Sequence, residues 1–306
     1  IGSSGTTKNL TIENPNTSSS SKGAIQFYGA SNDTIRYCTL KSSTTSKSGG
    51  SGTVSFNYNT NAGCSNNLIE YCDITKSGAN WPCVAIASSN TSSVYPSQNN
   101  TVRYCTIYDF KIAGIWLGCN AITYNNLWTI SNNTIYESSS FAYYYDSGSG
   151  CYYPNHGVYI GYHDCNATAS SYTDRGTHTI SNNTIGGNGS TGNWTVTGSS
   201  SSDNFAAPIY VAASNTSYGI DVNKYTYVFG NTIKDFDVQA SYFGGIWSDR
   251  SRIKIGDTIS GYSNYVYNII LRHASTTNGG TYACISASSS AANSANIVSN
   301  NVIHDI

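Results

Sequence analysis

The sequence predicts an all-β protein, a single parallel β-helix of roughly eight to nine coils with long loop insertions. The first observation is a short phrase, closed by Ile, Leu or Val, that recurs along all 306 residues; TISNNTI occurs twice, at 129–135 and 179–185. The second is a short apolar strand that follows each phrase, while helical periodicity is absent. Because one such unit cannot bury its apolar face alone, we expect the units to stack as coils.

The repeated phrases close on one apolar residue per coil, and the intervals between these residues are unequal. Unequal intervals are typical of stacked coils, because insertions leave the stack at turns. The closing residues are Ile12, Leu40, Ile74, Ile107, Ile135, Ile185, Ile233, Ile259 and Ile303.

Between the phrases lie partner strands that are short, β-branched and alternating. They are AIQF (24–27), TVSF (53–56), VAIA (84–87), GIWL (114–117), GVYI (157–160), PIYV (208–211), GIWS (245–248) and CISA (284–287). NIIL (268–271) is a further candidate, so the coil boundaries between 260 and 297 stay open. We expect each strand to pair in parallel with its copy about 4.8 Å away.

Residues at the same position in successive phrases form a column through the stack. One such column lies three residues after the first apolar residue of each phrase, and its side chains should point inward. Its members are Cys38, Cys72, Cys105, Asn133, Asn183, Asn231, Asp257 and Asn301. A stacked Asn can donate its amide to the next coil and satisfy buried backbone groups. The three Cys should be buried thiols, since parallel Cβ vectors suit a disulfide badly. Asp257 fits the column poorly and suggests a locally distorted coil.

The partner strands carry an outward aromatic column at Trp116, Tyr159, Tyr210 and Trp247, because their neighbours point inward. Such a stripe suits ligand binding, either to sugar rings or to a protein partner. The alternative is structural: the insertions at 136–156 and 186–207 could fold over the stripe.

Candidate catalytic residues lie near that stripe. His163 and Asp164 follow the strand GVYI, and Asp249 and Arg250 follow GIWS, so an acid/base pair is conceivable. The specificity of this pattern is weak, and common catalytic motifs are absent from the sequence. No metal site or cofactor is predicted, and a non-catalytic protein is favoured.

Charged residues make up 10% of the chain and its net charge is −1, against about 25% charged residues in typical domains. Arg36, Glu70 and Arg103 on consecutive coils predict a surface ion-pair ladder. Nucleic acid is a poor partner for this composition, and membrane insertion is not expected.

Abundant Tyr, Ser, Thr and Asn suggest an extracellular or cell-surface location. Because the chain starts and stops inside the repeat, residues 1–306 are expected to be one β-helix domain within a longer chain.

The phrases SNNTI, GAIQFYGASNDTIRYCTL and GCSNNLIEYCDI resemble the right-handed parallel β-helix repeats of the pectate-lyase-like superfamily. The opening, IGSSGTTKNLTIENPNTSSS, resembles large bacterial surface proteins exported by type IX secretion. The resemblance implies a right-handed helix and a secreted protein. The Asp motifs of polygalacturonases and the clustered calcium ligands of pectate lyases have no counterpart in the sequence.

These observations favour a structural, adhesive or filament-forming element at the cell surface, whose partners are other protein chains, through self-assembly, or polysaccharide. The alternatives are a polysaccharide-active lyase or hydrolase, and a carbohydrate-binding module that uses the aromatic stripe.

Overall fold

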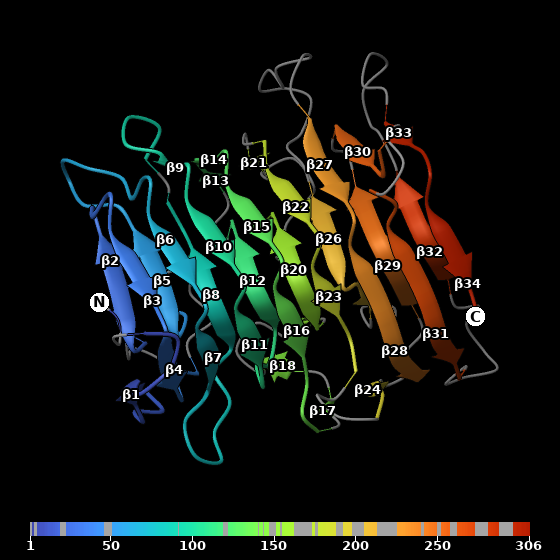
Figure 1. Ribbon diagram of the computed structural model, residues 1–306, viewed down its shortest axis with the longest axis horizontal. Coiled ribbons are helices and arrows are strands. Elements are labelled where there is room, and N and C mark those ends of the chain that lie inside the picture. Colours follow the sequence, from blue (N-terminus) through green and yellow to red (C-terminus); the bar gives the residue numbers. More distant parts are fainter. Residues whose placement is uncertain are drawn as a thin grey trace.

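The computed structural model describes residues 2, 5–18, 23–45, 51–90, 92–118, 122–139, 141–142, 144–146, 151–153, 155–161, 173–174, 177–187, 192–197, 205–212, 225–239, 242–249, 252–257, 262–272, 281–287 and 296–306. The regular secondary structure of these residues consists of β-strands alone, and three long sheets contain most of the strands. Figure 1 shows the strands side by side from the blue N-terminal end to the red C-terminal end.

Sheet A contains the first half of every repeated phrase after the first. Its eight strands are β3 (Thr34–Arg36), β6 (Leu68–Glu70), β10 (Thr101–Arg103), β15 (Thr129–Ser131), β22 (Thr179–Ser181), β27 (Thr226–Phe229), β30 (Ile253–Ile255) and β33 (Ile297–Val298).

Sheet B contains the second half of the phrases. Its eleven strands are β1 (Leu10–Asn14), β4 (Cys38–Ser42), β7 (Asp73–Lys76), β11 (Thr106–Tyr108), β16 (Thr134–Tyr136), β17 (Phe141–Ala142), β23 (Thr184–Ile185), β24 (Trp194–Thr197), β28 (Thr232–Gln239), β31 (Tyr265–Leu271) and β34 (Val302–His304).

Sheet C contains the partner strands. Its nine members are β2 (Ile25–Tyr28), β5 (Val54–Asn57), β8 (Val84–Ser88), β12 (Ala113–Leu117), β20 (His156–Ile160), β25 (Phe205–Ala206), β26 (Ile209–Ala212), β29 (Tyr242–Asp249) and β32 (Thr281–Ala287).

Three two-stranded sheets lie outside this framework. They pair β13 (Ile122–Thr123) with β21 (Thr173–Asp174), β14 (Asn125–Asn126) with β9 (Ser97–Gln98), and β18 (Tyr144–Asp146) with β19 (Cys151–Tyr153).

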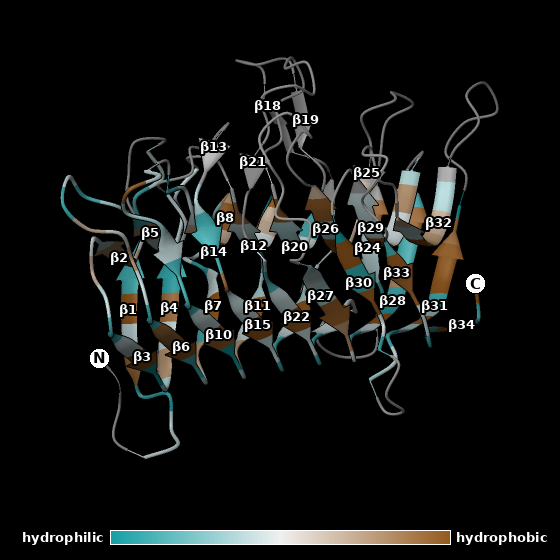
Figure 2. Ribbon diagram, turned by 90° about the horizontal axis from the view of Figure 1, so that it is seen from above, coloured by the Kyte–Doolittle hydropathy of each residue, from teal (hydrophilic) through white to brown (hydrophobic). Residues whose placement is uncertain are grey.

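The chain passes from sheet A to B to C and returns to A, for example through β6, β7 and β8 and then β10, β11 and β12. Strand pairs within the three sheets are parallel, and each strand matches its copy on the next coil. Figure 2 shows the sheet A strands from β3 to β27 following one another along one side of the stack. The protein is therefore an all-β parallel β-helix, as the repeat predicted.

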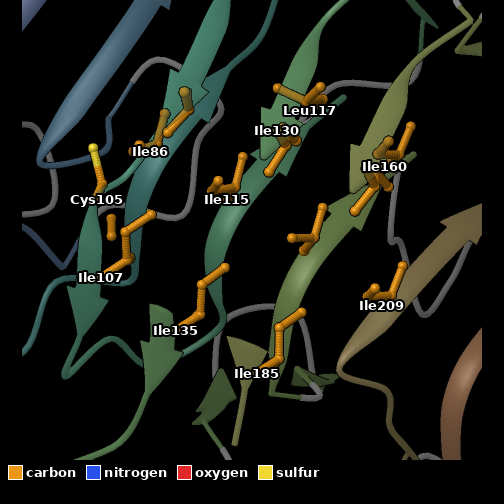
Figure 3. Packing of buried hydrophobic residues seen from close by; sticks show 14 of the residues in the cluster. Ile86, Cys105, Ile107, Ile115, Leu117, Ile130, Ile135, Ile160, Ile185 and Ile209 are labelled. Atoms are coloured by element: carbon orange, nitrogen blue, oxygen red, sulfur yellow. The ribbon is translucent and has the colours of Figure 1, made fainter. Parts of the chain in front are cut away.

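The core lies between the three sheets and is built from the inward apolar columns. Ile130 from sheet A, Ile135 and Ile185 from sheet B and Ile115 and Ile209 from sheet C are each fully buried. Their side chains point toward one another in Figure 3. Period-two alternation explains this placement, because only every second residue of a strand faces the interior.

The turn from sheet A to sheet B has a recurring left-handed residue, with φ between 48° and 66°. Asn and Gly adopt this conformation more readily than other residues. The residues at this position are Tyr37, Tyr71, Tyr104, Asn132, Asn182, Gly230 and Asn300. The conformation turns the following residue inward, which is how the predicted Cys and Asn column reaches the core.

The coil after residue 253 departs from the predicted alignment. Val266, not Ile259, pairs with Ile233 and Ile303 in sheet B. Ile259 lies outside the described residues. The segment NIIL (268–271) belongs to β31 of sheet B and is not an additional partner strand.

Candidate functional site

An asparagine ladder runs through the stack where sheet A turns into sheet B. Asn133 uses its backbone N–H and its Nδ2 to donate to Oδ1 of Asn183, each at 3.0 Å. Asn183 does the same to Asn231, at 3.0 and 2.9 Å, and its Nδ2 also donates to the carbonyl of Ile130. These amides satisfy backbone groups that are shielded from water. The ladder is structural, as the sequence indicated.

Asp257 is not a member of this ladder. Asn231 donates instead to Oδ1 of Asn264, at 3.0 Å, and Asn264 donates to Oδ1 of Asn301 at 2.9 Å. Asp257 is half-buried, and its carbonyl accepts a hydrogen bond from Asn300. The prediction that placed Asp257 in the column is therefore wrong. The Asn264 amide accepts from one coil and donates to the next, whereas an ionised carboxylate can only accept.

The cysteines of the column are buried free thiols, in agreement with the prediction. Hydrogen bonding with the Cys105 thiol lowers the pKa of Cys72, whereas burial raises the pKa of Cys105 well above its usual range. The Cys38 thiol donates a hydrogen bond to the carbonyl oxygen of Arg36 at 3.3 Å. The three side chains therefore extend the ladder as a compact apolar column.

A second asparagine ladder, which was not predicted, lies at the turn that enters sheet A. The N–H and Nδ2 of Asn67 both donate to Oδ1 of Asn100 at 3.0 Å, and the N–H of Asp33 donates to Asn67. The residues before them, Asn32, Asn66 and Asn99, have positive φ. The signal in the sequence was a polar pair directly before the first three sheet A strands, at 32–33, 66–67 and 99–100.

The ion-pair ladder on the outer face of sheet A is present. Nη2 of Arg103 lies 2.8 Å from the Glu70 carboxylate, and Nη1 of Arg36 lies 3.9 Å from it. Beside this ladder Tyr37, Tyr71 and Tyr104 stack with ring centroids 5.0 Å apart. The stack places aromatic and charged side chains on one outer edge of the first coils.

The predicted aromatic stripe has the expected register but not the expected exposure. Trp116, Tyr159, Tyr210 and Trp247 align on successive strands of sheet C. However, Trp116 is 1% exposed and Tyr159 is 2% exposed, while the other two rings are half-buried. The prediction of an open platform at the first two positions is therefore wrong. The alternative expected these rings to be covered, but much of the two insertions that it named, 136–156 and 186–207, lies outside the described residues.

The physical reason is a second apolar cluster on the outer side of sheet C. Trp116 and Tyr159 pack there with Cys83, Val84 and Ile112. The indole Nε1 of Trp116 donates to the carbonyl of Gly161 at 2.7 Å. A buried Trp whose N–H has found a partner is a packing residue.

His156 lies against this cluster and is 1% exposed. Its ring stacks on Tyr210 with centroids 5.4 Å apart, and its Nδ1 lies 2.8 Å from the carbonyl oxygen of Ala207.

The candidate catalytic residues have no described geometry. His163, Asp164 and Arg250 lie outside the described residues. Asp249 ends β29 with its backbone beside Ala212, and its side chain is not among those described.

A buried column of ionisable groups follows the ends of β7, β11 and β16. Lys76 Nζ lies 3.0 Å from Oδ2 of Asp109, whose Oδ1 accepts from the Ser138 hydroxyl at 2.6 Å. Glu137 is 0% exposed and its Oε1 accepts from the backbone N–H of Phe110, while its Oε2 has no hydrogen-bond partner. Burial, helped by the charge of Asp109, raises the pKa of Glu137 well above its usual range.

Comparison with known proteins leaves the chain defined by its fold class alone: a parallel β-helix. No protein-family model, no curated protein and no solved structure matches it. Among the described residues, no group of three or more His, Cys, Asp or Glu is placed to hold a metal ion. The same part of the chain contains no helix long and apolar enough to cross a membrane.

Proposed function

We propose that the chain is a structural and adhesive element that works at a cell surface or outside the cell. The observation that supports this most is a pair of threonine columns on the outer faces of two adjacent sheets. In sheet B the column contains Thr106, Thr134, Thr184 and Thr232. In sheet A it contains Thr101, Thr129 and Thr179.

The threonine side chains are half-buried or exposed, and they repeat at the coil spacing of about 4.8 Å. A hydroxyl both donates and accepts hydrogen bonds, so two such surfaces can satisfy each other or a polyhydroxylated polymer. Their lack of charge removes the electrostatic repulsion that keeps many proteins apart. A regular, uncharged hydroxyl surface is therefore suited to extended contact.

The finer proposal is a secreted bacterial surface protein with right-handed β-helix repeats of the pectate-lyase-like kind. It rests on the resemblance of the repeats and of the opening segment. The polar composition and the parallel coils are compatible with it.

The adhesive function is tested with beads coated with the whole chain, on surfaces coated with the same chain, with an uncharged polysaccharide or with neither. The double variant Thr134→Lys/Thr184→Lys places two positive charges in the sheet B column. We expect retention of these beads on a surface coated with the same variant to fall severalfold, because facing columns would then repel each other.

The matched control is Ala79→Lys/Val94→Lys, which adds the same charge at exposed positions away from the columns. Its bead retention should equal that of the unmodified chain. Retention of the unmodified chain no higher than on uncoated surfaces, or equal losses in both variants, contradicts the adhesive function.

A further inference from the structure

Four side chains form a basic and aromatic square on the outer face of sheet A. Thr226 pairs with Ile253 and Tyr227 pairs with Lys254. Because alternate residues of a strand share a face, Tyr225 and Tyr227 lie on the outer side, next to Arg252 and Lys254 of the following coil. We call these four residues the Tyr225 patch.

Both cations of the patch lie over tyrosine rings. The guanidinium carbon of Arg252 lies 4.7 Å from the Tyr225 ring centroid, and its Nη2 donates to the Tyr225 hydroxyl at 3.0 Å. Lys254 Nζ lies 4.6 Å from the Tyr225 centroid and 5.5 Å from that of Tyr227. The rings hold the two positive charges close together, as cation–π attraction permits.

Neither cation has a carboxylate partner in the described part of the chain. This contrasts with the cations that are paired with acidic groups, which are Lys8, Arg36, Lys76, Arg103, Lys234 and Arg272. Two neighbouring positive charges repel each other unless an anion lies near them. The patch is therefore an uncompensated positive site on a chain with few charges.

Arg252 has further unmet hydrogen-bonding capacity. Its Nε and Nη1 are buried and have no acceptor. Burying a polar donor without a partner is unfavourable. An anionic group beside the half-exposed side chain would compensate its charge.

The patch continues along β27 as an aromatic row. Tyr225 and Tyr227 have ring centroids 6.5 Å apart, and Phe229 follows on the same face and meets Tyr262 edge-on at 5.4 Å. Tyr227 and Tyr262 are each 40% exposed. Three alternate residues span about 13 Å of strand, which is long enough to meet more than one sugar ring.

We propose that the Tyr225 patch binds an acidic polysaccharide. Arg252 and Lys254 hold a carboxylate or sulfate-ester group of the polymer, and the exposed ring of Tyr227 stacks on the face of a sugar. This binding step involves no bond making or breaking. It gives the adhesive element a specific ligand class, and it rests on its own residues rather than on the threonine columns.

Single-stranded nucleic acid offers similar chemistry, but its regularly spaced phosphates favour a longer track of cations. The outward neighbours of the patch in the same column are Thr179 on the preceding coil and Ile297 on the following one. These uncharged residues favour a ligand with a local negative charge.

The test is affinity electrophoresis and calorimetry of the whole chain with dextran sulfate, polygalacturonate and uncharged dextran. We expect binding to one or both acidic polymers, weakening as salt is added, and none to dextran. Which acidic polymer binds distinguishes the sulfate ester from the carboxylate. The double variant Arg252→Gln/Lys254→Gln should bind at least tenfold more weakly, and Tyr227→Ala roughly five- to thirtyfold more weakly.

The matched control is Arg36→Gln/Lys41→Gln, which removes two positive charges at the opposite end of the stack and should leave binding unchanged. Thermal unfolding confirms that each variant is folded. The proposal is overturned if the chain binds neither acidic polymer, or if it binds dextran equally well. It is also overturned if the patch variants bind as the unmodified chain does, or if the chain prefers an oligothymidylate. Because the bead assay depends on the threonine columns, the adhesive function can fail while the patch still binds, and the reverse.

Discussion

Glu137 illustrates how a single residue can set the pH response of the stack. Its carboxyl group is fully buried, and one of its oxygens has no hydrogen-bond partner. Burial and the nearby Asp109 raise its pKa well above the usual range, so the folded protein favours the protonated form. An unfolded Glu ionises near pH 4.3. The stabilising contribution of the protonated form is therefore complete below about pH 4.3 and is lost as the pH rises through the folded pKa.

We predict that Glu137→Gln stabilises the protein at pH 7 by roughly 1–3 kcal/mol, because a neutral amide replaces a group that resists ionisation. The gain should shrink as the pH falls and disappear near pH 4. Urea unfolding at pH 4, 5.5 and 7 measures it, with the surface change Glu13→Gln as the control. A difference between Glu137→Gln and the unmodified chain that stays constant over this range contradicts the prediction.

Single residues also mark the limit of reading the sequence alone. The phrases YVFGNTI and IKIGDTI align Asn231 with Asp257, but the structure places Asn264 in the ladder. That alignment pairs Tyr227 with Ile253, one residue away from the observed pairing with Lys254. Since a slip of one residue reverses the faces of a strand, it also hid the Tyr225 patch.

At the scale of the strands, close coil spacing is maintained by glycines where side chains would collide. Gly186 has φ +121°, and a Cβ there would lie 1.8 Å from the carbonyl oxygen of Lys234. Gly187 also has positive φ, +77°, but a Cβ there would meet nothing closer than 3.6 Å. Substitution of Gly187 therefore introduces backbone strain alone, whereas substitution of Gly186 adds a steric collision.

We predict that Gly187→Ala costs about 1–2 kcal/mol, the usual cost of a left-handed non-glycine residue. Gly186→Ala should cost clearly more, because β23 and β28 must also move apart. Urea unfolding of the two variants compares them, and an equal loss of stability would show that the predicted collision is relieved without cost.

The strand elements were largely predictable, because their apolar alternation repeats in every coil. The exposure of the aromatic stripe was not. Alternation correctly placed Trp116 and Tyr159 on the outer side of sheet C, but it contains no information about a second apolar layer beyond that side. The second ladder, at Asn67 and Asn100, was missed because its residues precede the apolar phrases that guided the alignment.

At the scale of the whole molecule, stacking turns residues that are distant in sequence into neighbours. Asn133 and Asn183 are joined by hydrogen bonds across a separation of 50 residues. The same stacking forms the threonine columns and places Lys254 beside Tyr227. The proposed adhesive surface and the proposed ligand site therefore both depend on the register of the coils, which the ladders fix.

The register is tested most directly by comparing the stability of Asn264→Ala with that of Asp257→Ala in urea. Asn264 accepts two hydrogen bonds from Asn231 and donates to Val228 and Asn301. Its loss should cost about 3 kcal/mol or more, because several buried groups lose their partners. Asp257→Ala, at a half-buried position outside the ladder, should cost less than about 1 kcal/mol. A large loss for Asp257→Ala with little effect of Asn264→Ala would contradict the register and, with it, the placement of the Tyr225 patch.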